Sequence, residues 1–82
     1  MENRTTFYLI DEYTGELICK GVNYMDVIKP ALNLAYEQNC GLMRYWFDKK
    51  LYIDAGPRVF YIIADTDEGM KFLQNKLSGE EK

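Results

Sequence analysis

Five short stretches of the chain are rich in β-branched and aromatic residues, and polar turn residues separate most of them. Residues 5–10 and 17–20 flank a polar segment that contains Gly15, and this arrangement predicts an N-terminal β-hairpin. Residues 42–65 hold the densest cluster of apolar side chains. They predict three consecutive antiparallel strands, joined by turns at residues 48–50 and 54–57.

Alternation along these strands assigns their side chains to two faces of a sheet. The expected core face consists of Met43, Tyr45, Phe47, Leu51 and Ile53. The other face consists of Arg44, Trp46, Tyr52 and Arg58. This second face is either open to solvent or covered by the second helix or the N-terminal hairpin. Residues 59–64 are apolar throughout, which is typical of a central strand that is covered on both sides.

Apolar residues recur at helical spacing after Asn23. The stripe consists of Met25, Ile28, Leu32 and Ala35, and it is widened by Val27, Ala31 and Leu34. Asn23 is the expected N-cap, and Gly41 is the expected C-terminal stop. Proline removes a hydrogen bond from a helix interior. Pro30 therefore either kinks this helix or lies in its first turn.

A second amphipathic helix is predicted after the last strand. Asp65 and Glu68 have the spacing of a capping box at its start. Met70, Leu73 and Leu77 lie on one face, and the helix is expected to end at residues 78–79. We expect residues 1–4 and 79–82 to be frayed.

The predicted order of elements is β-β-α-β-β-β-α. Strands that follow one another through short turns pair as antiparallel neighbours, and two amphipathic helices need a sheet to pack against. The sequence therefore predicts an α+β fold, with a single antiparallel sheet and two helices. At 82 residues, the chain is expected to form one small globular domain spanning residues 1–82.

The chain is acidic, with a formal net charge of −3. A protein that binds duplex nucleic acid needs a basic surface to displace counterions, so the charge disfavours this partner. From the first helix onward, the order α-β-β-β-α is similar to that of double-stranded-RNA-binding domains. Those domains carry a basic cluster where this chain has Asp65, Asp67 and Glu68, so the resemblance extends to the order of elements alone.

Residues that carry common catalytic chemistry are scarce. The chain has no histidine, two isolated cysteines (Cys19 and Cys40) and no glycine-rich phosphate loop. We therefore predict that it is not an enzyme, and that it holds no cofactor and no metal ion. Residues 1–6 lack the pattern of a signal peptide, and no apolar run is long enough to span a bilayer. These features predict a cytoplasmic protein without a membrane partner.

The first functional hypothesis is a non-catalytic protein-binding module whose partner has a basic surface. Small acidic proteins of this kind include inhibitors of host or defence factors that phages and other mobile elements encode. The residues expected to contact the partner are Asp11, Glu12, Glu16, Asp48, Asp65, Asp67 and Glu68. Turns and helix caps also select acidic residues, so a purely local role is the competing interpretation.

Two other hypotheses remain open at this stage. Arg44, Trp46, Tyr52 and Arg58 would together suit a small ligand, a nucleotide or a single-stranded nucleic acid, because aromatic rings stack on bases and arginine pairs with phosphate. Alternatively, an apolar face of a helix or of the sheet is buried in a homodimer, and the protein is a self-associating scaffold.

Overall fold

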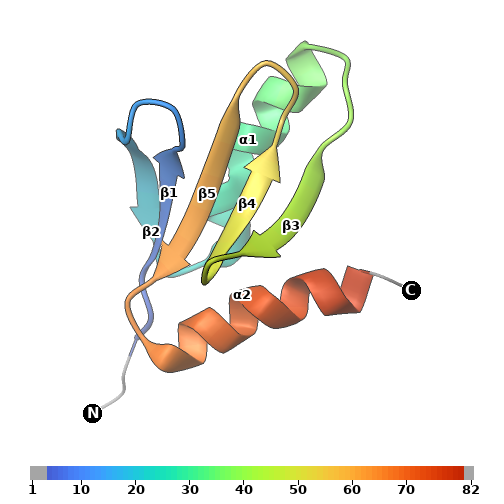
Figure 1. Cartoon of the computed structure of the whole chain (residues 1–82). Coiled ribbons are helices and arrows are strands. Elements are labelled where there is room, and N and C mark those ends of the chain that lie inside the picture. The colour runs from blue at the N-terminus through green and yellow to red at the C-terminus, as the bar shows by residue number, and fades with distance from the viewer. Residues whose placement is uncertain (1–3, 81–82) are drawn as a thin grey trace.

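The computed structural model describes residues 4–80, with side chains described as far as Lys76. The predicted order of elements is confirmed, and so is the single antiparallel sheet (Figure 1). The elements are β1 (Phe7–Asp11), β2 (Leu17–Gly21), α1 (Tyr24–Glu37), β3 (Met43–Phe47), β4 (Lys50–Asp54), β5 (Val59–Ala64) and α2 (Asp67–Glu80). The predicted fraying of residues 1–3 and 81–82 lies outside the described residues, whereas residues 79 and 80 belong to α2.

The five strands have the order β2-β1-β5-β4-β3, and every neighbouring pair is antiparallel. The apolar strand β5 is central, as predicted. Leu9 of β1 and Leu51 of β4 lie opposite Ile62 of β5, and all three side chains are 0% exposed. Ile28 of α1 and Leu73 of α2 belong to the same core cluster. In Figure 1, α1 lies behind the sheet and α2 runs across one end of its strands.

The expected assignment of faces is wrong for β3. Tyr45 pairs with Tyr52 and Trp46 pairs with Leu51, so Arg44 and Trp46 share the core face with Leu51 and Ile53. The residues expected in the core, Met43, Tyr45 and Phe47, are 62%, 42% and 64% exposed on the opposite face. The difference arises at the turn. It consists of Asp48 and Lys49 alone, and Lys50 already belongs to β4. A turn one residue shorter than expected moves every β3 side chain to the other face.

The first helix begins where its cap predicts. The side chain of Asn23 accepts a hydrogen bond from the backbone N–H of Met25 (3.0 Å). Since α1 starts at Tyr24, Pro30 lies inside the helix, beyond its first turn. The helix ends at Glu37 with Gln38 as its C-cap, and Asn39 rather than Gly41 takes up the left-handed conformation (φ 56°) that follows many helix ends. The buried stripe consists of Tyr24, Val27, Ile28, Ala31 and Ala35, while the predicted members Met25 and Leu32 are exposed.

The cap of α2 also differs from the prediction. The hydroxyl of Thr66 accepts a hydrogen bond from the N–H of Gly69 (2.9 Å), so Thr66 caps the helix. Asp65 instead accepts a hydrogen bond from the backbone N–H of Thr6 (2.9 Å) and ties the chain before β1 to the end of β5. Gly69 is buried where α2 passes close to Thr5 and Ala64.

Candidate functional site: the open face of the sheet

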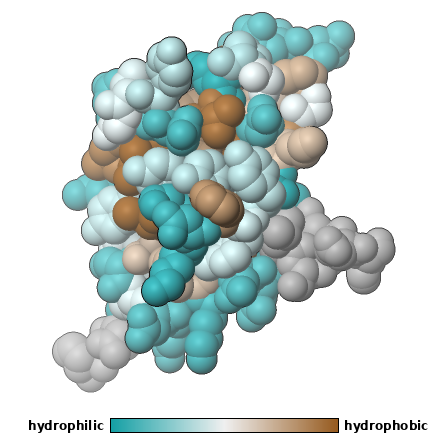
Figure 2. Space-filling view, viewed as in Figure 1, coloured by the Kyte–Doolittle hydropathy of each residue, from teal (hydrophilic) through white to brown (hydrophobic). Residues whose placement is uncertain are grey.

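Among the residues that the structure describes, neither helix covers one face of the sheet (Figure 1). We call it the open face. Its residues are Tyr8, Ile10, Leu17, Lys20, Met43, Tyr45, Phe47, Lys50, Tyr52, Asp54, Val59, Tyr61 and Ile63. Figure 2 looks onto this face and shows brown and pale side chains over the strands, with mainly teal side chains along α2 below them. The expectation that both faces of β5 would be covered is therefore wrong.

A row of tyrosines runs across the open face. Tyr61 of β5, Tyr52 of β4 and Tyr45 of β3 lie directly opposite one another in the strand register. The rings of Tyr45 and Tyr52 are stacked, with centroids 5.2 Å apart and planes inclined by 4°. The centroids of Tyr52 and Tyr61 are 5.6 Å apart. Each such aromatic pair contributes about 0.5–1.5 kcal/mol beyond the burial of its area. We call these three residues the tyrosine row.

The stacking determines which parts of the rings a partner can reach. The ring of Tyr52 contacts the rings of Tyr45 and Tyr61 on either side of it in the row. It also contacts the ring of Phe47, whose centroid lies 6.3 Å from that of Tyr52. The ammonium of Lys50 lies 5.5 Å from the centroid of Tyr61. Ring surface in the centre of the row is therefore already in contact with neighbouring side chains. At Tyr52 the row therefore presents mainly the ring edge and the hydroxyl group, which suit a surface with both apolar area and hydrogen-bonding groups.

Charged residues flank the tyrosine row on opposite sides. Lys20 lies opposite Tyr8, and Lys50 lies opposite Phe47, at the end of the strands where α2 begins. Asp54 lies opposite Val59 at the other end, and the backbone N–H of Glu12 donates a hydrogen bond to the carbonyl of Val59 (3.0 Å). The open face is thus apolar in its centre, with Lys20 and Lys50 at one end of its strands and Asp54 and Glu12 at the other. The Lys50 ammonium is already paired with the Asp48 carboxylate (3.6 Å).

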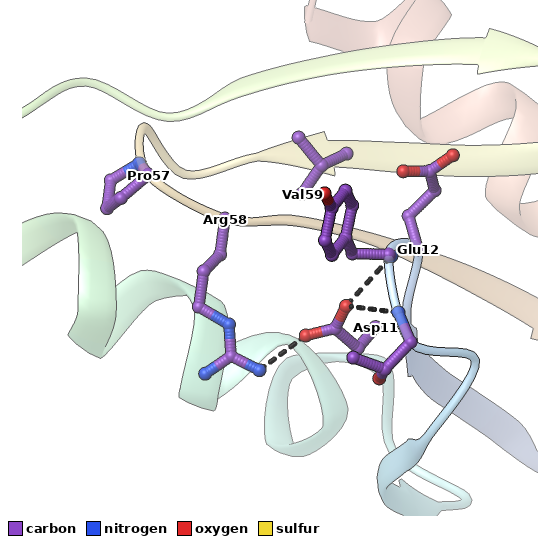
Figure 3. A pocket seen from close by; sticks show the side chains of 7 residues that line it. Asp11, Glu12, Pro57, Arg58 and Val59 are labelled. Carbon is purple, nitrogen blue, oxygen red and sulfur yellow. Dashed lines mark hydrogen bonds and ion pairs between the residues drawn. The ribbon is translucent and has the colours of Figure 1, made fainter.

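A second feature is the cavity of about 370 Å³ between the β1–β2 and β4–β5 turns (Figure 3). Asp11 is 3% exposed and forms an ion pair with Arg58. It also accepts hydrogen bonds from the backbone N–H groups of Tyr13 (2.8 Å) and Thr14 (3.1 Å). The Arg58 side chain and these N–H groups hold the pKa of Asp11 below its ordinary value. The carboxylate of Asp11 is therefore engaged within the fold and joins the two turns.

Acidification is expected to release this link. The Asp11 carboxyl titrates near its ordinary value of 3.8 in the unfolded chain and at a lower pKa in the folded protein. The unfolded state therefore takes up the proton first. The contribution to stability is complete above about pH 5 and is lost as the pH falls through the folded-state pKa. The urea midpoint of the Asp11→Asn variant should be lower at neutral pH and should fall less steeply below pH 5 than that of the wild type. Equal slopes would contradict this role.

The seven acidic residues predicted to contact a partner do not form one surface. Glu12 and Glu16 lie near the β1–β2 turn, where Asp11 is buried in its ion pair. The other four lie at the opposite end of the sheet in Figure 1. Asp48 lies in the β3–β4 turn, 3.6 Å from the Lys50 ammonium, and Asp65, Asp67 and Glu68 lie at the start of α2.

The four residues of the alternative ligand face are also separated. Tyr52 lies on the open face, whereas Trp46 packs against the core cluster and a guanidinium nitrogen of Arg44 donates to the Tyr24 hydroxyl (3.3 Å). Arg58 pairs with Asp11. The interpretation of the sequence missed Tyr45, Tyr61 and Lys50 as members of the open face. The length of the β3–β4 turn carries the signal that would have placed Tyr45 and Lys50 there.

The two thiols have structural partners. The Cys19 thiol donates to the carbonyl of Val27 (3.3 Å), and burial raises its pKa, so it is held as a neutral thiol. The Cys40 thiol donates to the carbonyl of Ala55 (3.4 Å). Within residues 4–80, no cluster of three or more His, Cys, Asp or Glu side chains is arranged to hold a metal ion. Neither helix, over its described residues, is long and apolar enough to cross a membrane.

Comparison with known proteins returned no match: no protein-family model, no curated protein and no solved structure is significantly similar to this chain. The functional assignment therefore depends on the geometry of the open face.

Proposed function

We propose that this protein is a non-catalytic protein-binding module whose partner docks on the open face. The observation that supports the proposal is the tyrosine row, which places three aromatic side chains, each in contact with the next, on a sheet face that neither helix covers. Aromatic residues near the centre of an interface supply a large share of its binding energy. Tyrosine in particular adds a hydrogen-bonding group at low cost in conformational entropy.

The same geometry favours a protein over a nucleotide or a single-stranded nucleic acid. Base stacking requires an accessible ring face, whereas the ring of Tyr52 is packed against Tyr45, Phe47 and Tyr61. Lys20 and Lys50 could attract a phosphate backbone at one end of the face, but Asp54 and Glu12 would repel it at the other end. Arg44 and Arg58, the guanidinium groups expected to bind phosphate, lie away from the open face.

The charges on the open face define the chemistry of the partner. The partner's surface is expected to be apolar in the centre, with an acidic group facing Lys20 and basic groups facing Asp54 and Glu12, because Lys50 is already paired with Asp48. Five strands spaced about 4.8 Å apart, each about 17 Å long, give a flat area of about 400 Å². A partner that covered it would bury about 800 Å² in total, which lies below the standard interface size and in the range of weak, transient complexes. We therefore expect a reversible complex. The expected inhibition of a cellular factor stays a prediction.

Truncating the centre of the tyrosine row should weaken partner binding at least tenfold. The Tyr52→Ala variant removes the ring that contacts Tyr45, Phe47 and Tyr61. Truncating an aromatic residue at the centre of an interface typically reduces the binding free energy by about 2 kcal/mol or more. A partner would be captured from lysate on three immobilised proteins: the wild type, Tyr52→Ala and the control Tyr36→Ala. Tyr36 lies on α1 and is 87% exposed, so its truncation removes a ring away from the open face.

The captured protein would then be purified, and its affinity for each variant measured by calorimetry after thermal unfolding has shown that each variant is folded. The proposal requires binding that Tyr36→Ala preserves and Tyr52→Ala loses. Equal affinity for the two variants would reject the open face as the binding site. Tyr52-dependent binding of a nucleotide or oligonucleotide, with no protein bound, would reject the protein partner.

A further inference from the structure

Within the described residues, the outer edge of β3 carries no bulge, proline or lysine, which are common protections of a strand edge. β3 is the last strand of the sheet, and its register with β4 is regular from Met43 to Phe47. Its sequence, MRYWF, contains no proline and no lysine. The opposite edge strand, β2, pairs with β1 through an irregular register at Leu9 and Ile10 and carries Lys20 on the open face. β2 therefore has two of these protections, whereas the charged residue of β3, Arg44, lies on the core face and donates to the Tyr24 hydroxyl.

The β3–β4 turn fixes which peptide groups of β3 face outward. Asp48 and Lys49 both have positive φ angles (54° and 62°), as a two-residue type I′ hairpin requires. In such a turn the carbonyl of Phe47 accepts from the N–H of Lys50. Peptide groups alternate in direction along an antiparallel strand. Those of residues 43, 45 and 47 therefore point toward β4, and those of residues 44 and 46 point toward the outer edge.

We propose that β3 pairs antiparallel with β3 of a second copy of this chain, with Tyr45 opposite Tyr45. This register sets Arg44 of each copy opposite Trp46 of the other, so both outward-facing residues of each strand take part. A shift of two residues would instead place Arg44 opposite Arg44 or Trp46 opposite Trp46. The first alternative sets like charges against each other, and both use fewer of the outward-facing peptide groups.

The side chains on the open face fit this register. In an antiparallel sheet, a residue pair without mutual hydrogen bonds has its Cα atoms about 4.5 Å apart, which brings the two Tyr45 side chains into contact. Tyr45 is stacked on Tyr52 on one side and remains 42% exposed. Met43 of each copy lies opposite Phe47 of the other, and these side chains are 62% and 64% exposed. The two tyrosine rows join into one, and the open faces of both copies stay accessible to a partner.

Sedimentation of the purified protein over concentrations up to about 1 mM tests the dimer. The wild type is expected to shift reversibly from monomer to dimer. Tyr45→Lys places two like charges opposite each other where the two copies of β3 meet. It should raise the dissociation constant of the dimer at least tenfold. Tyr36→Lys makes the same change in charge on α1 and should leave the dissociation constant unchanged. A wild type that stays monomeric, or a dimer that Tyr45→Lys does not weaken, would overturn the proposal.

A disulfide experiment tests the register. Cα atoms about 4.5 Å apart lie within the range that a disulfide spans, so oxidised Tyr45→Cys should form a dimer linked through residue 45. Phe47→Cys is the matched control, because the two copies of residue 47 would lie about 13 Å apart in this register. Peptide mapping by mass spectrometry identifies the linked cysteines and separates them from Cys19 and Cys40. Linkage through residue 47 in preference to residue 45 would overturn the register. Neither experiment involves the partner on the open face, so the two proposals can fail separately.

Discussion

Replacement of Ile62 by alanine is expected to remove most of the stability of this fold. Ile62 is 0% exposed on the central strand and lies between Leu9 and Leu51, which are equally buried. Truncating a buried isoleucine costs about 2–5 kcal/mol, because the neighbouring side chains fill only part of the cavity that is left. The total stability of a small domain is about 5–15 kcal/mol, and a chain of this length is expected near the lower limit.

The next residue in the sequence provides the control. Ile63 points to the open face, where its side chain is only partly buried, so Ile63→Ala should cost about 1 kcal/mol or less. Urea unfolding of both variants measures the difference directly. A large loss for Ile62→Ala and a small one for Ile63→Ala would support a core on one side of the sheet. Similar losses would mean that β5 is covered on both faces.

Gly69→Ala is expected to destabilise the protein by about 1–3 kcal/mol, the usual cost of overpacking. At most other helical positions, replacing glycine by alanine increases the free energy of unfolding by up to about 1 kcal/mol. Here a Cβ atom on Gly69 would lie 2.3 Å from the methyl carbon of Thr5 and 2.7 Å from the Cβ of Ala64. Since Ala64 belongs to the central strand, relief of the contact requires α2 to move away from the sheet.

Two variants show whether the close contact causes this loss. A Cβ atom on Gly41 would meet no atom within 4 Å, so Gly41→Ala should change the unfolding free energy by only a few tenths of a kcal/mol. Adding Thr5→Ser to Gly69→Ala removes one of the two clashing carbons and should restore part of the stability. A Gly69→Ala protein at least as stable as the wild type would show that α2 does not pack as closely as the structure indicates.

The order of the elements was predictable from the sequence because its signals are local. β-Branched and aromatic runs form the strands, Asn23 caps α1, and the apolar run 59–64 occupies the centre of the sheet. The position of Pro30 was not predictable. A proline disfavours the helix interior, but the packing of Val27, Ile28 and Ala31 against the sheet keeps α1 continuous around it.

The face assignment of β3 could not be decided from composition, because both faces of this strand carry large apolar side chains. A turn of three residues at 48–50 would place Phe47 opposite Leu51 and send Tyr45 into the core. The observed turn has two residues, so Phe47 lies opposite Lys50 and Tyr45 lies opposite Tyr52. Two consecutive residues with positive φ angles, neither of them glycine, are uncommon, and this is why the pattern favoured a longer turn.

The placement of the acidic residues depends on tertiary structure in the same way. Asp11 and Glu12 are adjacent in the sequence but differ in their surroundings. Asp11 points into the fold toward Arg58, whereas Glu12 lies at the acidic end of the open face, next to Val59. Alternation along a strand separates adjacent residues, and the approach of the β4–β5 turn gives Asp11 its partner. A sequence-based list of acidic residues does not contain this information.

The most direct test of the open face as a docking surface is hydroxyl-radical footprinting of the protein, alone and in complex with the partner that the wild type captures. Radicals modify accessible aromatic side chains, so each ring reports on its own exposure. We expect protection of Tyr45, Phe47 and Tyr52 in the complex, with Tyr13 and Tyr36 modified as in the free protein. Protection of Tyr13 or Tyr36, with the tyrosine row unchanged, would place the interface elsewhere and contradict the proposed function.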